Sequence, residues 1–243
     1  MTLVTAYDYP TGRLLDEAGV DIVLVGDSLG MVVLGFPDTT HVTLDHMLHH
    51  VEATARGVKN ALLVGDMPIH SYDTVEQAVQ SAKKLFLAGA DAVKLEGGAA
   101  QAGNIRAIVE AGIPVVGHIG LLPQKVLEEG GYKIKGKSSA EEEALVRDVE
   151  AVAEAGACAV VVEGVTPHAA RQVTVHSSIP TLGIGSGSHT CDGDVVVIHD
   201  LVGAFPWFIP AFVKPRADVA GSMTAAVKEW MEDCYTEPGS ISS

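Results

Sequence analysis

The sequence has few cysteines, few basic residues and no long apolar run. Its three cysteines, Cys158, Cys191 and Cys234, are too few and too scattered for a disulfide framework. No window approaches the roughly 18 uninterrupted apolar residues that a membrane-spanning helix needs. The N-terminal residues Met1 to Asp8 lack the basic start and apolar stretch of a signal peptide. We therefore expect a cytoplasmic protein without a membrane segment.

The chain is also poor in positive charge. Lys and Arg number 16 against 31 Asp and Glu, which gives a formal net charge of −15. Nucleic-acid phosphates and anionic membrane surfaces both require a basic protein surface, so we expect neither as a partner. Such a charge ordinarily serves solubility, and adaptation to high salt is the alternative. With 47% apolar and 19% charged residues among 243, the chain is neither disordered nor fibrous.

A short pattern recurs along the chain: a helix end of small residues, a glycine and an apolar run. It occupies residues 17–27, 87–97 and 154–164, with a looser copy at 110–117. Each copy predicts a joint between a helix and a strand, with the glycine in the left-handed conformation. The runs are apolar throughout rather than alternating, which is typical of parallel strands that are buried on both faces. The sequence therefore predicts an α/β protein.

Eight apolar runs predict eight strands. They are Leu3–Ala6, Ile22–Val25, Leu62–Gly65, Ala92–Leu95, Pro114–Gly117, Ala159–Val162, Thr181–Ile184 and Phe212–Lys214. Helices are expected at Thr43–Lys59 with Thr43 as N-cap, Asp73–Ala88 with Asp73 as N-cap, Ser139–Ala155 with a Ser139–Glu142 capping box, and Val219–Cys234. Strands that alternate with helices in this way predict one (β/α)8 barrel domain over residues 1–243. An open, doubly wound sheet is the alternative.

In such a barrel, catalytic groups lie where strands end and the following loops begin. Polar or charged side chains follow five of the predicted strands, and these residues are Asp27, Ser28, Asp66, Lys94, Glu96, His118 and Glu163. Buried ionisable groups are costly unless they are paired or bind a metal ion. Their convergence at successive strand ends predicts an active site.

Asp27 and Asp66 end neighbouring strands, so we expect them to face each other. Two close carboxylates repel unless a proton or a cation joins them. Oxygen ligands without cysteine or a histidine cluster favour Mg²⁺ or Mn²⁺, completed by water and a substrate oxygen. Capping of the next helix is the structural alternative for each aspartate.

The remaining charged side chains suit an anionic substrate. Glu163 follows an apolar strand, which suits a general base, with a structural ion pair as the alternative. Lys94 is suited to hold a substrate carboxylate, or else pairs with Glu96 or Asp66. His118 is suited to hydrogen-bond a substrate oxygen, with a purely structural histidine as the alternative.

A long connection, residues 121–138, separates the fifth predicted strand from its helix. It carries four of the ten lysines, which are Lys125, Lys133, Lys135 and Lys137. On an acidic chain, this concentration predicts either a solvated loop or a lid that contacts an anionic ligand.

Seven motifs, in order between about Thr5 and Lys214, resemble those of one enzyme family. They are Thr5-Ala6-Tyr7-Asp8-Tyr9, Val25-Gly26-Asp27-Ser28-Leu29-Gly30-Met31, Gly65-Asp66-Met67-Pro68, Val93-Lys94-Leu95-Glu96-Gly97-Gly98, Gly117-His118-Ile119-Gly120-Leu121, Gly130-Gly131-Tyr132-Lys133 and Cys191-Asp192-Gly193. Through these motifs, the chain is similar to ketopantoate (3-methyl-2-oxobutanoate) hydroxymethyltransferases.

The resemblance implies a (β/α)8 barrel of the phosphoenolpyruvate-binding type and a homo-oligomer, often a decamer. It implies transfer of a hydroxymethyl group from the co-substrate 5,10-methylenetetrahydrofolate to 3-methyl-2-oxobutanoate, which gives 2-dehydropantoate for pantothenate and coenzyme A synthesis. By family analogy, Asp27 and Asp66 hold Mg²⁺, with Glu96 in or beside its shell. Ser28 and Lys94 bind the 2-oxoacid, and Glu163 is the base that removes a proton.

Two other functions stay open. A metal-dependent 2-oxoacid lyase or mutase of the same superfamily needs the same metal-stabilised enolate but no folate. A non-catalytic barrel scaffold has no use for charged strand ends, so Asp27, Asp66, Lys94 and Glu163 argue against it.

Overall fold

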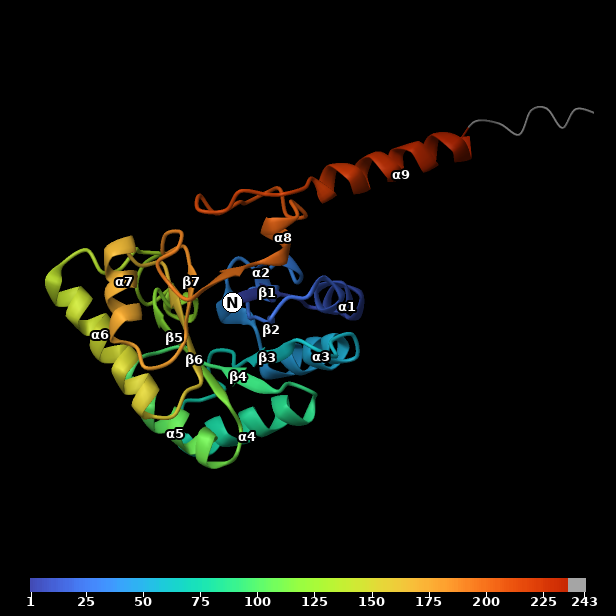
Figure 1. Ribbon diagram of the computed structural model, residues 1–243. Coiled ribbons are helices and arrows are strands. Elements are labelled where there is room, and N and C mark those ends of the chain that lie inside the picture. Colours follow the sequence, from blue (N-terminus) through green and yellow to red (C-terminus); the bar gives the residue numbers. More distant parts are fainter. Residues whose placement is uncertain (236–243) are drawn as a thin grey trace, which may run out of the picture. The chain divides into compact units, whose positions relative to one another are not determined.

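The computed structural model describes residues 1–235, and these contain a closed ring of eight parallel strands (Figure 1). The strands are β1 (Thr2–Thr5), β2 (Ile22–Val25), β3 (Leu62–Asp66), β4 (Ala92–Lys94), β5 (Val115–Gly120), β6 (Ala159–Glu163), β7 (Thr181–Ile184) and β8 (Gly193–Val196). Each strand pairs with the next one in the chain, and β8 pairs with β1. The predicted (β/α)8 barrel is confirmed, and the open sheet is wrong.

Helices connect most of the strands, and Figure 1 shows α3 to α7 arranged outside the ring. The α-helices are α1 (Tyr9–Ala18), α2 (Leu29–Val32), α3 (Leu44–Ala55), α4 (Val75–Leu87), α5 (Ala102–Glu110), α6 (Ser139–Glu154), α7 (Pro167–His176), α8 (Ile198–Leu201) and α9 (Val219–Tyr235). The 3-10 helices are η1 (Thr39–His41), η2 (Ala99–Gln101) and η3 (Pro123–Lys125).

The eighth strand is not at Phe212–Lys214, contrary to the prediction. It is β8, and Phe212 is 59% exposed in a segment of turns. The connection between β7 and β8, residues 185–192, contains turns and no helix. The predicted alternation of helices and strands therefore fails between β7 and β8. The prediction also missed the β-branched run that begins at Val195, whose first residues belong to β8.

Two helix starts differ from the prediction by one residue. The N-cap of α4 is Thr74 rather than Asp73, and that of α6 is Ser138 rather than Ser139. Thr74 and Ser138 have the extended backbone of an N-cap, and each side chain accepts a backbone N–H of the first turn. Backbone conformation decides between two adjacent residues that are both chemically able to cap. Thr43 caps α3 as predicted.

The recurring glycines adopt the predicted left-handed conformation. The φ angles are 81° at Gly19, 111° at Gly89, 86° at Gly112 and 98° at Gly156. Glycine enters this region without the steric cost of a Cβ atom, so each one ends a helix and turns the chain into the next strand. These joints lie at the end of the barrel opposite to the loops that follow the strands.

The interior of the ring is a packed apolar core. It is formed by Leu3, Ile22, Leu24, Val64, Ala92, Val116, Ala159, Val161 and Leu182, all buried. Side chains that fill a barrel interior leave no channel through it. Polar groups therefore gather at the carboxyl ends of the strands.

By contacts, the chain divides into two compact units, Met1–Val197 and the residues from Ile198 on. The first unit contains the whole strand ring. The second contains α8 and α9, and no residue of α9 is buried. Units of this kind are defined by contacts rather than by independent folding, so the single domain over residues 1–243 stays a prediction.

The structure bears on two sequence-based expectations, the lack of a membrane-spanning helix and the lack of disulfides. Within residues 1–235, no helix combines the length and the apolar character that crossing a membrane requires. Cys158, Cys191 and Cys234 are free thiols, as their scattered positions predict.

Candidate active site

The ends of β2 and β3 bring Asp27 and Asp66 together. Asp66 is the last residue of β3, and Asp27 lies two residues beyond β2. The backbone N–H of Asp27 donates to Oδ2 of Asp66 at 3.1 Å, and both residues are buried. Neither side chain caps a helix, because the N-caps of α2 and α4 are Ser28 and Thr74. The structural alternative of helix capping is therefore wrong for both aspartates.

Lys94, the last residue of β4, pairs with Asp66. Its Nζ donates to Oδ1 of Asp66 at 2.6 Å, and both side chains are buried. Burial acts to lower the pKa of Lys94, but the charges of Asp66 and Glu96 outweigh it, so the pKa is raised. Lys94 therefore stays cationic. This ion pair with Asp66 is the predicted alternative to binding a substrate carboxylate.

His118, in β5, lies between two carboxylates. Its Nε2 is 3.2 Å from Oε2 of Glu163 and its Nδ1 is 3.6 Å from Oε1 of Glu96. Burial, followed by the charge of Lys94, lowers the pKa of His118, so the ring is neutral near pH 7. Neither ring nitrogen has the alignment of a hydrogen bond with a protein group, and the same holds for Oε1 of Glu96.

Glu163 is the most accessible of the charged residues predicted for the site. It is the last residue of β6, and its side chain is 22% exposed, whereas that of His118 is 2% exposed. A carboxylate at this depth touches the buried cluster through His118 and is open to a ligand on its other side. This position suits a general base.

Negative charge exceeds positive charge at these strand ends. Burial, followed by the charge of Asp66, raises the pKa of Asp27 to about 7. Burial, followed by the charge of Asp27, raises the pKa of Glu96 well above its ordinary value. With Lys94 already paired to Asp66, the cluster favours a proton or a further cation.

The donor set fits a hard divalent cation. Within residues 1–235, no three His, Cys, Asp or Glu side chains form a ready-made metal cage. Mg²⁺ needs none, because it keeps several waters and takes one or two carboxylates together with substrate oxygens. Oε1 of Glu96 is buried and without a hydrogen bond, and a nearby cation or its water would satisfy it. The assignment of Asp27, Asp66 and Glu96 as ligands stays a prediction.

Ser28 presents a hydroxyl beside this cluster. It is the N-cap of α2, but its side chain makes no capping hydrogen bond. Its Oγ lies 2.8 Å from the hydroxyl of Tyr7, which is buried. Ser28 is half-buried, so its hydroxyl is oriented by Tyr7 and remains accessible to a ligand.

Three polar residues around the cluster are absent from the sequence-based prediction, namely Tyr7, Tyr72 and Gln124. Gln124 lies in η3, directly beyond β5, and is 3% exposed. Its side chain donates to Oδ2 of Asp27 at 2.8 Å. Gln124 was not predicted because its amide is uncharged and lies in a loop whose lysines are more conspicuous in the sequence.

The loop 121–138 reaches the same end of the barrel. The hydroxyl of Tyr132 lies 3.8 Å from Sδ of Met31 in α2. Burial, followed by the charge of Asp38, raises the pKa of Tyr132. Lys133 and Lys135 both bind Glu129 of the same loop. Lys125 pairs with Glu128, so three of the four lysines have partners inside the loop. Contact with an anionic ligand stays a prediction.

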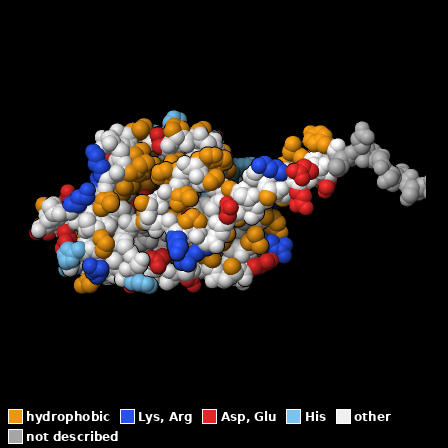
Figure 2. All heavy atoms as spheres, turned by 90° about the horizontal axis from the view of Figure 1, so that it is seen from above, with side chains coloured by type: hydrophobic (Ala, Val, Ile, Leu, Met, Phe, Trp, Pro, Cys, Tyr) orange, Lys and Arg blue, Asp and Glu red, His pale blue; other side chains and the backbone are white. Residues whose placement is uncertain are grey.

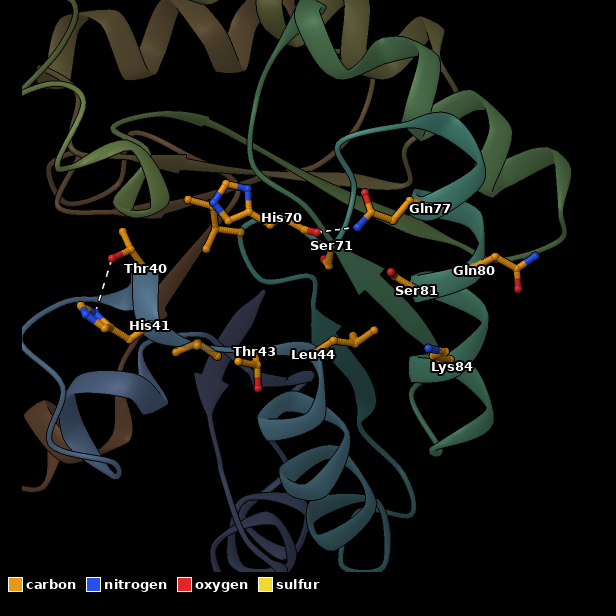
Figure 3. Close-up of a pocket in the computed structure, with 12 residues that line it drawn as sticks. Thr40, His41, Thr43, Leu44, His70, Ser71, Gln77, Gln80, Ser81 and Lys84 are labelled. Atoms are coloured by element: carbon orange, nitrogen blue, oxygen red, sulfur yellow. Dashed lines mark hydrogen bonds between the residues drawn. The ribbon is translucent and has the colours of Figure 1, made fainter.

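The structure also contains a surface pocket of about 430 Å³ (Figure 3). It is formed by the segment from Thr40 to Leu44, by Ile69 to Ser71 and by one face of α4 that ends at Lys84. None of the predicted site residues lines it. We therefore place the functional site at the strand ends and not in this pocket.

The chain is similar to proteins of known family. The model of one family, described as "Ketopantoate hydroxymethyltransferase", matches residues 1–238. The chain belongs to the ketopantoate hydroxymethyltransferase family. The 3-methyl-2-oxobutanoate hydroxymethyltransferase of Ignicoccus hospitalis is 50% identical over 234 residues, which cover 96% of this chain and 88% of that protein. The enzyme of the same name from Moorella thermoacetica is 50% identical over 235 residues, 96% of this chain and 87% of that protein.

Solved structures share the barrel with this member of the ketopantoate hydroxymethyltransferase family. A phosphoenolpyruvate phosphomutase from Streptomyces platensis subsp. rosaceus has a TM-score of 0.68 at 18% identity, over 98% of this chain and 87% of that one. A 2,3-dimethylmalate lyase, a member of the PEP mutase/isocitrate lyase superfamily, has a TM-score of 0.63 at 19% identity, over 100% and 86%. These likenesses confirm the predicted (β/α)8 barrel fold.

Proposed function

We propose that the chain transfers a hydroxymethyl group from 5,10-methylenetetrahydrofolate to 3-methyl-2-oxobutanoate and so forms 2-dehydropantoate. Membership of the family supports this reaction. The observation that carries it in the structure is the buried cluster of Asp27, Asp66, Glu96 and Lys94, with the more accessible Glu163 at its edge. Such a cluster is suited to activate a 2-oxoacid.

Mg²⁺ is the cation that we propose for this cluster. Asp27 and Asp66 would hold it, and Glu96 would lie in or beside its shell. When bound, the cation supplies positive charge to the ketone and carboxylate oxygens of the 2-oxoacid, which makes the proton on C3 more acidic. A phosphonopyruvate hydrolase of the same fold, with a TM-score of 0.65 at 15% identity over 98% of this chain and 94% of that one, was solved with oxalate and Mg²⁺.

The residues around the cation bind and orient the substrate. Lys94 stays charged beside Asp66 and attracts the substrate carboxylate. The Ser28 hydroxyl, oriented by Tyr7, donates to a substrate oxygen. His118 is neutral and so has a single ring N–H, which no protein group accepts, and we assign this N–H to a substrate oxygen.

Glu163 takes the proton from C3 of the 2-oxoacid, and the electron pair of that C–H bond becomes the enolate of the substrate. The enolate carbon then forms a C–C bond with the methylene carbon of the folate, whose C–N bonds break in turn. One water supplies the hydroxyl of the new hydroxymethyl group. The products are 2-dehydropantoate and tetrahydrofolate.

The complete reaction with one component withheld at a time tests this function. We expect 2-dehydropantoate only when the chain, Mg²⁺, the 2-oxoacid and methylenetetrahydrofolate are all present. Cleavage or rearrangement of a 2-oxoacid without folate would instead identify a lyase or mutase. Absence of any turnover, together with absence of proton exchange at C3, would leave the barrel as a scaffold and contradict the proposal.

We also propose that the chain forms a homo-oligomer, because α9 has a surface suited to bind a second copy. Met223, Val227, Trp230 and Met231 recur at spacings of three or four residues on α9 and are 41–65% exposed. Figure 2 shows apolar side chains beside acidic ones along this helix. An apolar stripe of this kind marks an interaction surface. A decamer is the expected size, and sedimentation of the full chain against its Trp230→Glu variant tests the role of α9.

The expected location and partners follow from the sequence. Three free cysteines fit a reducing compartment, and we propose the cytoplasm. The net charge of −15 disfavours nucleic acid and anionic membrane as partners. The proposed partners are therefore small-molecule substrates and further copies of the chain.

A further inference from the structure

One amide side chain joins the loops that carry the acidic cluster. Nε2 of Gln124 donates to Oδ2 of Asp27 at 2.8 Å and to the carbonyl oxygen of Met67 at 3.0 Å. The backbone N–H of the same residue donates to Oε2 of Glu96 at 3.1 Å. Gln124 therefore connects the loop after β5 to the ends of β2, β3 and β4.

Tyr72 fixes the direction of this amide. Its hydroxyl donates to Oε1 of Gln124 at 2.5 Å, and both residues are buried. Burial, followed by the charge of Glu96, raises the pKa of Tyr72, so the hydroxyl keeps the proton that it donates. The reversed amide would turn Oε1 toward the Asp27 carboxylate and the Met67 carbonyl, two acceptors that repel it. The network therefore allows one orientation only.

A neutral donor has an advantage over a cation at this position. Lysine or arginine would orient Asp27 but would also neutralise its charge. The amide of Gln124 holds the same carboxylate and leaves the negative charge available to a bound cation. Through its backbone N–H it also holds Oε2 of Glu96, while Oε1 of that carboxylate has no hydrogen bond.

We propose that Gln124, locked by Tyr72, is a positioning residue that sets the Asp27 and Glu96 carboxylates for a divalent cation. The inference rests on the proposed function, which places Mg²⁺ at these residues. Gln124 acts through the carboxylates and does not touch the substrate. Groups that orient metal ligands in this way typically contribute a factor of roughly 10 to 100 in metal affinity.

Titration of the full-length protein with Mg²⁺ by calorimetry, in saturating 3-methyl-2-oxobutanoate, tests the inference. In Gln124→Met, which keeps the volume and removes the amide, we expect the Kd for Mg²⁺ to rise about tenfold to a hundredfold. Tyr72→Phe should raise it less, and the double variant should be no weaker than Gln124→Met alone, since the hydroxyl acts only through the amide. Gln80→Met, on the exposed face of α4, is the matched control and should bind as the wild type does.

Thermal unfolding without metal is measured in parallel, so that a loss of fold is not mistaken for a loss of affinity. If Gln124→Met does not fold, Tyr72→Phe, which removes a single oxygen atom, carries the test. A folded variant with wild-type affinity for Mg²⁺ would overturn the positioning role alone. Absence of Mg²⁺ binding by the wild type would instead remove the proposed metal site, and the inference with it.

Discussion

The backbone N–H of Asp27 and the side chain of Asp66 are joined by a hydrogen bond of 3.1 Å across two neighbouring strand ends. Asp66 also accepts a hydrogen bond from Lys94, so one carboxylate ties together the ends of β2, β3 and β4. Asp27 is oriented instead by the neutral amide of Gln124. The two aspartates are therefore close in space, but only Asp66 has a cationic partner.

Asp27→Ala and Asp66→Ala should each weaken the binding of Mg²⁺. Removal of a proposed ligand takes away both an oxygen donor and a negative charge. Calorimetry in the presence of the 2-oxoacid measures the effect, and Asp45→Ala, an exposed aspartate of α3, is the control. Wild-type affinity in both variants would refute the role assigned to these carboxylates.

Lys94→Met should destabilise the metal-free protein by about 3–5 kcal/mol, because it leaves the buried Asp66 without its cation. Denaturant unfolding measures this change. Arg13→Met breaks the exposed pair with Glu17 and should leave the midpoint almost unchanged, since exposed ion pairs contribute little. Equal midpoints for Lys94→Met and Arg13→Met would show that the buried pair is not a source of stability.

The metal-free protein should lose stability as the pH rises from about 4 to 7. The pKa of Asp27 is raised from 3.8 to about 7, so in this range the folded state binds a proton that the unfolded state has released. Below pH 4 both states are protonated, and above pH 7 the full penalty is present. Asp27→Asn should flatten this part of the profile, and saturating Mg²⁺ should do the same. An unchanged slope in Asp27→Asn would contradict the assignment.

Glu163→Gln should abolish exchange of the C3 proton of 3-methyl-2-oxobutanoate in D₂O. A general base typically contributes a factor of roughly 10² to 10⁴, and the amide cannot accept the proton. Proton NMR follows the exchange, which should require Mg²⁺ in the wild type. Glu150→Gln, an exposed change on α6, is the control. If Glu163→Gln exchanges the proton at the wild-type rate, another group is the base.

Seven strands of the barrel were predictable because each is an apolar run buried on both faces, and four were preceded by the recurring glycine joint. The eighth was not, because the turns at residues 185–192 replace the helix that the alternation leads one to expect. Charged strand ends such as Asp66 and Lys94 are visible in the sequence as polar breaks after apolar runs. The role of Gln124 is not, since it depends on the path of a loop.

The four glycine joints and the acidic cluster occupy opposite ends of the same strands. Substitutions at Gly19, Gly89, Gly112 or Gly156 therefore act on folding and not on ligand contacts, because the packed core separates them from the carboxylates. A library of variants selected for thermal tolerance and one selected for altered substrate preference would draw their mutations from different loops. Improvements from the two selections should then combine additively in one chain.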